Sequence, residues 1–429
     1  MNGRSERGPE DDAVGATDNP GLSVSGGDSR TDKRCLSVAP VPATRLSLLF
    51  VCALFLCACT QEGAVPSKYR RAVEAGTKKS KVAWKIDFHA HVATMSFERA
   101  QRIMDRNGIA LAVNLTPGFP GGGLETALMM SHLTGDRIVN FVNIDWEDVG
   151  DPARFAETNV RHLKRAKAMG ARGLKISKAL GLGIPAAGIE AAMKEHTSAS
   201  ELLRVDDPRL DPIWEEAGRQ GLPVSIHTAD PVVFFHAVTP SNERYRELSV
   251  HPHWSFFGPQ WPKFEDLIGQ LRKVVASHPA TLFVGVHFGN FAENPSFVGK
   301  MLDEFPNYHI DVAARVPEFG RHDAGKMRDF FVKYQDRVLF GTDLGVGRSL
   351  MLGSGGDTEP TEDDAEKFYD AHWRYFETGD RRIDHPTPIQ GDWKIDAIDL
   401  PVPVLEKLYY KNAEKLLGVR LNPVDLAPH

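Results

Sequence analysis

The feature that most constrains the fold is a regular alternation of short apolar runs with helix-like segments from Lys85 onward. The runs are rich in Val, Ile, Leu and Phe, and many of the segments between them end in Gly or Asn, as helices often do. Eight runs follow one another, at 85–92, 108–116, 138–146, 171–177, 222–230, 282–289, 308–315 and 338–344. Strands that alternate with helices predict an α/β fold, and eight of them predict a (β/α)8 TIM barrel. A doubly wound open sheet is the alternative, but no glycine-rich phosphate loop follows the first run.

Several of these runs end in residue types that bind metal ions. The first contains His89 and His91, which share a face because side chains alternate along a strand, and Asp87 is expected on that same face. Three more such residues close the fifth, sixth and eighth runs: His227, His287 and Asp343. The carboxyl ends of barrel strands ring one mouth, so we expect these side chains to converge there.

This constellation resembles the amidohydrolase superfamily, in particular its amidohydrolase-related branch of lactone and amide hydrolases and metal-dependent decarboxylases. The resemblance covers about residues 85–418. It implies that the metal ligands are His89, His91 and His227, with Asp343 as fourth ligand or as a base beside the ion. It also implies that His287 orients water or polarises the substrate. Imidazoles with one carboxylate suit one divalent ion such as Zn²⁺, with Mn²⁺ or Fe²⁺ as alternatives.

Lys175 in the fourth run leaves the number of metal ions open. In two-metal members of the superfamily, a lysine on this strand is carboxylated and bridges two ions. In one-metal members, a lysine nearby belongs to the pocket or to the edge of the core. We favour one ion because the wider motif is closer to the one-metal branch, and we keep the Lys175 bridge as the alternative. Lys178 is expected to face solvent.

Substrate contacts are predicted from position alone. Trp146 and Arg315 stand at the ends of the third and seventh runs, and Arg315 could grip a substrate carboxylate or form a structural ion pair. His253 lies in a long aromatic insertion after the fifth run, which forms a pocket lid or packs on itself. The acidic and aromatic segment 345–400 after the eighth run is expected to fold over the barrel mouth.

The N-terminal part has a different composition from the barrel region, 85–429. Residues 1–44 are rich in Gly, Ser, Asp and Arg without apolar periodicity, which predicts disorder. Residues 45–59 combine Arg45, a short apolar run and a final Leu-Cys-Ala-Cys, and they resemble a bacterial lipoprotein signal. That resemblance implies lipid on Cys59, export to the cell envelope and a flexible linker over 60–84. The 44 residues before the signal are long for its positive region, which leaves the translation start open.

Composition excludes several classes of protein. The net charge is −6 and no basic stripe occurs, which argues against binding to nucleic acid. All four cysteines lie at or before Cys59, so the barrel region holds neither a disulfide nor a cysteine metal ligand. The only expected membrane contact is the lipid anchor.

The sequence therefore predicts a lipid-anchored, metal-dependent hydrolase that cleaves amide, lactone or ester bonds of a small organic molecule. A decarboxylase of a small carboxylic acid is the alternative within enzymes. A surface binding lipoprotein without catalysis is the alternative outside them, but every ligand position of the motif is filled.

Overall fold

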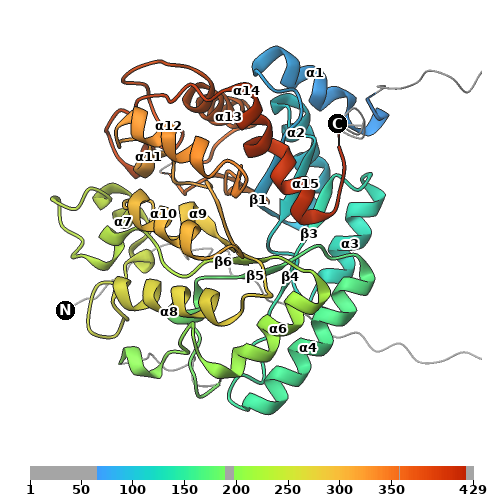
Figure 1. The fold of residues 1–429 in the computed structure, drawn as a ribbon, viewed down its shortest axis with the longest axis vertical. Coiled ribbons are helices and arrows are strands. Elements are labelled where there is room, and N and C mark those ends of the chain that lie inside the picture. Colours follow the sequence, from blue (N-terminus) through green and yellow to red (C-terminus); the bar gives the residue numbers. More distant parts are fainter. Residues whose placement is uncertain (1–64, 189–197, 357, 422–429) are drawn as a thin grey trace, which may run out of the picture. The chain divides into compact units, whose positions relative to one another are not determined.

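The computed structural model of the chain describes residues 65–188, 198–356 and 358–421 (Figure 1). The predicted disordered extension 1–44 and the signal segment 45–59 with Cys59 lie outside the described residues. Within the described part, no helix combines the length and the apolar character needed to cross a membrane.

Parallel strands form the centre of the fold, and all but β10 lie within the predicted apolar runs. They are β1 Ile86–Val92, β2 Leu111–Asn114, β3 Ile138–Asn140, β4 Val142–Asn143, β5 Leu174–Ile176, β6 Val224–Ile226, β7 Phe283–Gly285, β8 Tyr308–Asp311, β9 Val338–Leu339 and β10 Leu344–Val346. A short strand, β11 Leu350–Leu352, pairs antiparallel with β10.

The strands close into a ring through two short breaks. Hydrogen bonding gives one sheet of order β11-β10-β1-β2-β3 and another of order β4-β5-β6-β7-β8-β9. Phe141 joins β3 to β4, and its N–H donates to the carbonyl of Asn114. Residues 340–343 join β9 to β10, and the Phe340 carbonyl accepts a bond from the N–H of Phe88 at 2.9 Å. Because β3/β4 and β9/β10 each fill one strand position, the structure confirms the predicted (β/α)8 barrel.

Helices surround the strands (Figure 1). Those between strands are α2 Phe97–Asn107, α3 Leu124–Leu133, α4 Pro152–Met169, α6 Asp211–Gln220, α8 Phe264–Ser277, α10 Pro295–Glu304 and α12 Ala324–Lys333. Local sequence explains the ends of α4: the Asp151 side chain accepts a bond from the N–H of Arg154, and Gly170 ends the helix in the left-handed conformation. Its buried face, with Phe155 and Leu163, packs toward the core.

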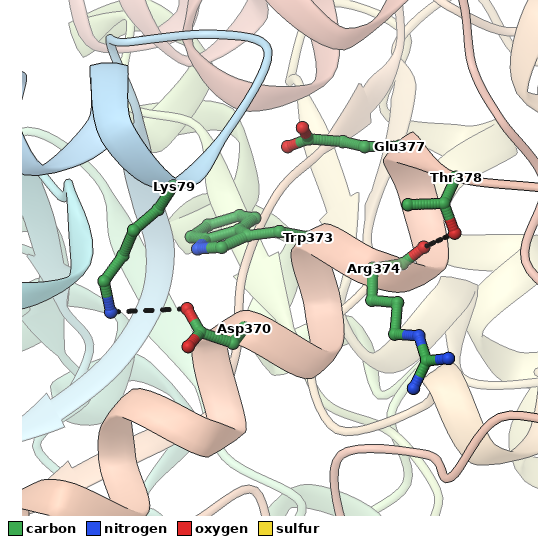
Figure 2. Close-up of a pocket in the computed structure, with 6 residues that line it drawn as sticks. All are labelled: Lys79, Asp370, Trp373, Arg374, Glu377 and Thr378. Carbon is green, nitrogen blue, oxygen red and sulfur yellow. Dashed lines mark hydrogen bonds and ion pairs between the residues drawn. The ribbon is translucent and has the colours of Figure 1, made fainter. Parts of the chain in front are cut away.

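The prediction of a flexible linker over 60–84 is wrong for the described part of that segment. Helix α1 (Arg70–Lys79) buries Ala72 and Val73 and packs against α2. The end of α1 has ion-pair partners on α13 (Glu362–Glu377). Figure 2 shows Lys79 facing Asp370, 3.3 Å away. The pocket of about 310 Å³ at this junction is lined by Lys79, Asp370, Trp373, Arg374, Glu377 and Thr378.

The segment 345–400 only partly follows the expectation that it covers the mouth. Helix α13 begins with a capping box between Thr361 and Asp364 and packs against α2 at the side of the barrel. The parts on either side of α13 reach the loops at the strand ends. The carbonyl of Gly355 lies 3.3 Å from Nε2 of His251, and Nε1 of Trp393 donates to the Pro317 carbonyl at 2.8 Å.

Buried Glu377 should anchor the end of α1 to the barrel. Its carboxylate accepts bonds from the hydroxyls of Ser80 (2.5 Å) and Tyr409 (2.9 Å) and from the N–H of Lys81 (2.6 Å). We expect Glu377→Ala to lower the free energy of unfolding by about 2–4 kcal/mol, since buried donors lose a charged acceptor. Urea unfolding measures this, and limited proteolysis should show faster cleavage within 70–84.

Glu366→Ala is the matched control. Glu366 also pairs with Lys79, at 3.3 Å, but both side chains are partly exposed. Its loss should therefore cost about 0–1 kcal/mol. Equal effects of the two variants would contradict the anchoring role of Glu377.

Candidate metal centre

Three of the predicted ligands form a close group at the barrel mouth. Nε2 of His91 lies 3.1 Å from Oδ1 of Asp343, and Nε2 of His89 lies 3.4 Å from the same oxygen. The ligand atoms of the three residues all lie within 4.8 Å of one another. His89 is fully buried, whereas His91 and Asp343 are partly accessible. The group is therefore buried at His89 and accessible at His91 and Asp343. A site that admits a substrate needs such an accessible side.

The close approach of two chain segments brings these residues together. The backbone N–H of Asp343 donates to the His89 carbonyl at 2.8 Å. A Cβ atom on Gly341 would lie 2.8 Å from Cβ of His89, so only glycine fits there. Asp343 has a φ of +64°, a left-handed backbone that is rare for a residue with a side chain.

Asp87 does not join this group, so its expected place beside the two histidines is wrong. The pairing of β1 with β2 shifts register between Asp87 and Ala90, which breaks the simple alternation of faces. The Asp87 carboxylate instead accepts bonds from Thr342 and from the hydroxyl of Tyr369 on α13. Burial raises the pKa of Asp87 to about 6, although these bonds oppose the shift.

Asp311 at the end of β8 is a functional residue that the sequence analysis did not single out. Its Oδ2 lies 2.8 Å from Nδ1 of His89, and its Oδ1 accepts the backbone N–H of His287 at 2.8 Å. A carboxylate behind one imidazole nitrogen fixes the ring so that the other nitrogen faces the site. The only available signal was an acidic residue closing an apolar strand, at a position that the predicted barrel places at the mouth.

His287 and His227 continue the cluster on the next two strand ends. The ring centroid of His287 lies 4.8 Å from that of His89 and 4.4 Å from that of His227. Nδ1 of His287 lies 2.9 Å from the Ala313 carbonyl, which holds the ring in place. Nε2 of His227 lies 3.3 Å from Oδ1 of Asp230, and His227 is not part of the close group formed by the described residues. Its role as a third ligand stays a prediction.

The electrostatics of the cluster suit a cation. Burial lowers the pKa of His227 to about 4, and it also lowers the pKa values of His89 and His287. Burial alone would raise the pKa of Asp343, but the neighbouring His89, His91 and His287 hold it well below its usual range. At neutral pH His89, His227 and His287 are therefore neutral and the Asp343 carboxylate is ionised, the states in which these groups bind metals.

Lys175 on β5 is buried, and its Nζ has no hydrogen-bond partner among the described residues. Burial lowers its pKa to about 8, and the charges of Asp311 and Asp343 oppose this shift. Lys175 thus faces the cluster, but a carboxylated lysine that bridges two ions stays an alternative.

Lys178 is only partly exposed, with 33% of its side chain accessible, so the expectation that it faces solvent holds only in part. Its Nζ lies 2.5 Å from Oδ2 of Asp230 and 5.6 Å from the ring centroids of Trp254 and Phe256. Its partner Asp230 follows β6 and was missed because a single aspartate in a loop carries no motif. Arg315 reaches the same carboxylate, with Nη2 3.8 Å from Oδ1. Burial alone would raise the pKa of Asp230, but the nearby positive charges keep it below its usual value.

The other two predicted substrate contacts, Trp146 and His253, pack against aromatic neighbours. The Trp146 ring stacks on Phe155 of α4, with centroids 5.7 Å apart. His253 is exposed and makes ring contacts with His251 and Trp254. In the described part of the chain, neither residue hydrogen-bonds to the cluster or stacks on it.

A family model described as amidohydrolase matches residues 87–419, more than half of the chain. The chain belongs to the amidohydrolase family. Amidohydrolases are metal-dependent enzymes that act on small molecules, which agrees with the His-His-Asp group described above. Among curated proteins, no sequence matches the chain significantly.

The solved structures that match this amidohydrolase do so at low sequence identity. An uncharacterised TIM-barrel protein from Bordetella bronchiseptica is 14% identical with a TM-score of 0.46; the match covers 78% of this chain and 98% of that one. A 2,6-dihydroxybenzoate decarboxylase from Rhizobium is 16% identical, with a TM-score of 0.40 and coverage of 78% and 98%. A probable 2-pyrone-4,6-dicarboxylic acid hydrolase from Acinetobacter baumannii is 13% identical, with a TM-score of 0.43 and coverage of 78% and 99%.

The lowered pKa of His227 predicts a pH-dependent stability of the metal-free protein. The value is about 4 in the folded state against 6.5 for an ordinary histidine. Between these values the unfolded chain binds more protons, so stability should fall as the pH is lowered through this window. We expect His227→Asn to reduce the slope of the unfolding free energy against pH by the amount that corresponds to about one bound proton. Urea unfolding of chelator-treated protein between pH 4.5 and 7 measures this.

His132→Asn is the control, since the His132 side chain is 82% exposed. It should leave the pH dependence unchanged. A His227→Asn protein with the wild-type slope would disprove the buried, neutral state of this imidazole.

Proposed function

We propose that this amidohydrolase is a metal-dependent hydrolase that cleaves a C–N or C–O bond of a small amide, lactone or ester. The convergence of His89, His91 and Asp343 on one point carries the proposal. Among the described residues, buried Nε2 of His89 has no hydrogen-bond partner and lies 3.4 Å from Oδ1 of Asp343, so its lone pair is available to a cation. The donor set of imidazole nitrogens and a carboxylate oxygen suits Zn²⁺, with Mn²⁺ or Fe²⁺ as alternatives.

The residues that would hold the ion are His89, His91 and Asp343, with His227 as the proposed further ligand. When bound, a divalent ion supplies Lewis acidity, which polarises a carbonyl oxygen and makes water more acidic. Asp343 is ionised and partly accessible, so its free oxygen can take a proton from water and return it to the leaving group.

His287 would act on the substrate by position. Its backbone N–H is fixed by Asp311 and its Nδ1 lies against the Ala313 carbonyl. If Nδ1 carries the proton that this carbonyl accepts, Nε2 is left as an acceptor for water or a substrate hydroxyl. The Lys175 ammonium faces the same space and can stabilise negative charge on the substrate.

Decarboxylation of a small carboxylic acid is the second candidate, and one observation favours it. Lys178 and Arg315 flank the single carboxylate of Asp230 beside His227, which leaves an excess of positive charge on this side of the site. Two cations near a metal site suit a substrate carboxylate. A binding protein without catalysis is the third and least supported candidate, because the family is enzymatic and the ligand group is intact.

We also propose that the enzyme is exported and tethered to the cell envelope by lipid on Cys59. The support is the sequence alone: an apolar run followed by Leu-Cys-Ala-Cys, and no cysteine after residue 59. We expect Cys59→Ser to abolish incorporation of a labelled fatty acid and to leave the protein out of the membrane fraction. Cys57→Ser is the matched control and should still be labelled. A labelled Cys59→Ser protein would show that the site is wrong.

The catalytic proposal predicts a separation of metal binding from turnover. Purified protein should bind about one Zn²⁺ per chain. Asp343→Asn should keep part of this metal but lose turnover by about 10²- to 10⁴-fold, the usual contribution of general acid–base catalysis. His287→Asn should keep the metal and also lose turnover, and exposed His132→Asn should change neither. Metal analysis and a screen of amides, lactones and aromatic acids provide the measurements.

The products decide between the two reactions. Incorporation of ¹⁸O from labelled water indicates hydrolysis, whereas release of carbon dioxide without incorporation indicates decarboxylation. Two ions per chain, with one lost in Lys175→Ala, would favour the bridging lysine. Full activity of Asp343→Asn with normal metal content would refute the proposed mechanism.

A further inference from the structure

The backbone on either side of Asp343 is held by its neighbour Thr342. Asp343 itself has a left-handed φ of +64°, a conformation that persists only where the surroundings impose it. The hydroxyl of Thr342 accepts the N–H of Leu344 at 3.2 Å, so it spans the Asp343 residue. The orientation of the Asp343 carboxylate therefore depends on where Thr342 is fixed.

Thr342 is fixed by the fully buried carboxylate of Asp87. Oδ1 of Asp87 accepts the N–H of Thr342 at 3.1 Å, and Oδ2 accepts its hydroxyl at 2.5 Å. Oδ1 also accepts the N–H of His89 at 3.2 Å. The Asp87 carboxylate thus holds the backbone beside His89 and Asp343. These two residues and His91 form the metal group, to which Asp87 itself does not belong.

Helix α13 supplies the last contact of this carboxylate. The hydroxyl of Tyr369 donates to Oδ2 of Asp87 at 2.7 Å, and both residues are fully buried. The next residue on α13, Asp370, faces Lys79 of α1 at the junction in Figure 2. The segment after the last barrel strand therefore reaches the metal group from outside the barrel, through one chain of hydrogen bonds.

We propose that Asp87 is a positioning residue for the metal-binding carboxylate: it fixes Thr342, and through it Asp343, and Tyr369 of α13 completes this arrangement. The inference rests on the proposed function, since it assumes that Asp343 binds a metal ion. Asp87 acts through Thr342, because its oxygens already accept bonds from the backbone, Thr342 and Tyr369.

Zn²⁺ affinity of the metal-depleted full chain, measured by competition with a chromogenic chelator, tests the proposal. Thr342→Val should weaken Zn²⁺ binding by about 10- to 100-fold, the usual loss when a group that orients a ligand is removed. Thr342→Ser keeps the hydroxyl and should bind Zn²⁺ as tightly as the wild-type protein. With any substrate that is found, Thr342→Val should lower kcat with little change in KM. The substitution should displace the metal-binding Asp343 but leave the substrate contacts in place.

A double-mutant cycle isolates the path from Asp87 to Thr342. Asp87→Asn should weaken Zn²⁺ binding in the wild-type background but add little in the Thr342→Val background, because the two act as one unit. Tyr369→Phe should also weaken binding. Tyr375→Phe is its matched control: Tyr375 is buried on the same helix, and its hydroxyl has no hydrogen-bond partner among the described residues.

The outcomes separate the two proposals. Wild-type Zn²⁺ affinity in Thr342→Val, additive losses in the double variant, or an equal loss in Tyr375→Phe would overturn the positioning role and leave the metal site standing. Failure of the wild-type protein to bind any of Zn²⁺, Mn²⁺ and Fe²⁺ would instead overturn the proposed function, and the positioning role with it.

Discussion

Hydrogen bonds from buried carboxylates to backbone N–H groups are the interactions on which the site depends. Asp311 accepts the N–H of His287 and of Ala313 and also contacts the ring of His89. His287 and Asp343 both have left-handed backbones, which cost on the order of 1–3 kcal/mol each. Folding offsets this cost through the buried bonds, which preorganise the backbone of these residues. Such preorganisation is what a metal site needs in order to bind tightly and in one geometry.

The charges around the cluster divide into two sides. On one side, Asp343 contributes negative charge between His89 and His91. On the other, Lys178 and Arg315 outweigh Asp230. A neutral His227 stands between them, since burial lowers its pKa to about 4. For the decarboxylase alternative, Lys178 and Arg315 would bind the carboxylate of the substrate on the Asp230 side of the cluster.

The sequence predicted the barrel well because hydrophobic periodicity and helix caps are local signals. Strands β1 and β2, for example, lie within the predicted runs 85–92 and 108–116. Its failures concern interactions between distant residues. The register shift after Asp87 depends on pairing with β2, and the ion pair of Lys178 with Asp230 joins two different loops. Helix α1 was missed because its stability comes from packing on α2 and from Glu377, not from a strong local pattern. Asp311 was missed because one acidic residue at a strand end has no motif of its own.

The metal group lies where the barrel closes on itself. His89 is on the first strand and Asp343 precedes the last, and the Asp87–Thr342 bonds join residues 255 positions apart. An ion bound here would link the first strand to the residues before β10. It would close a long loop of the chain and so restrict the conformations of the unfolded state. The proposed metal ion should therefore also slow unfolding. The metal-loaded protein should unfold slowly, whereas the metal-free protein should first lose the contacts between β1 and residues 340–343.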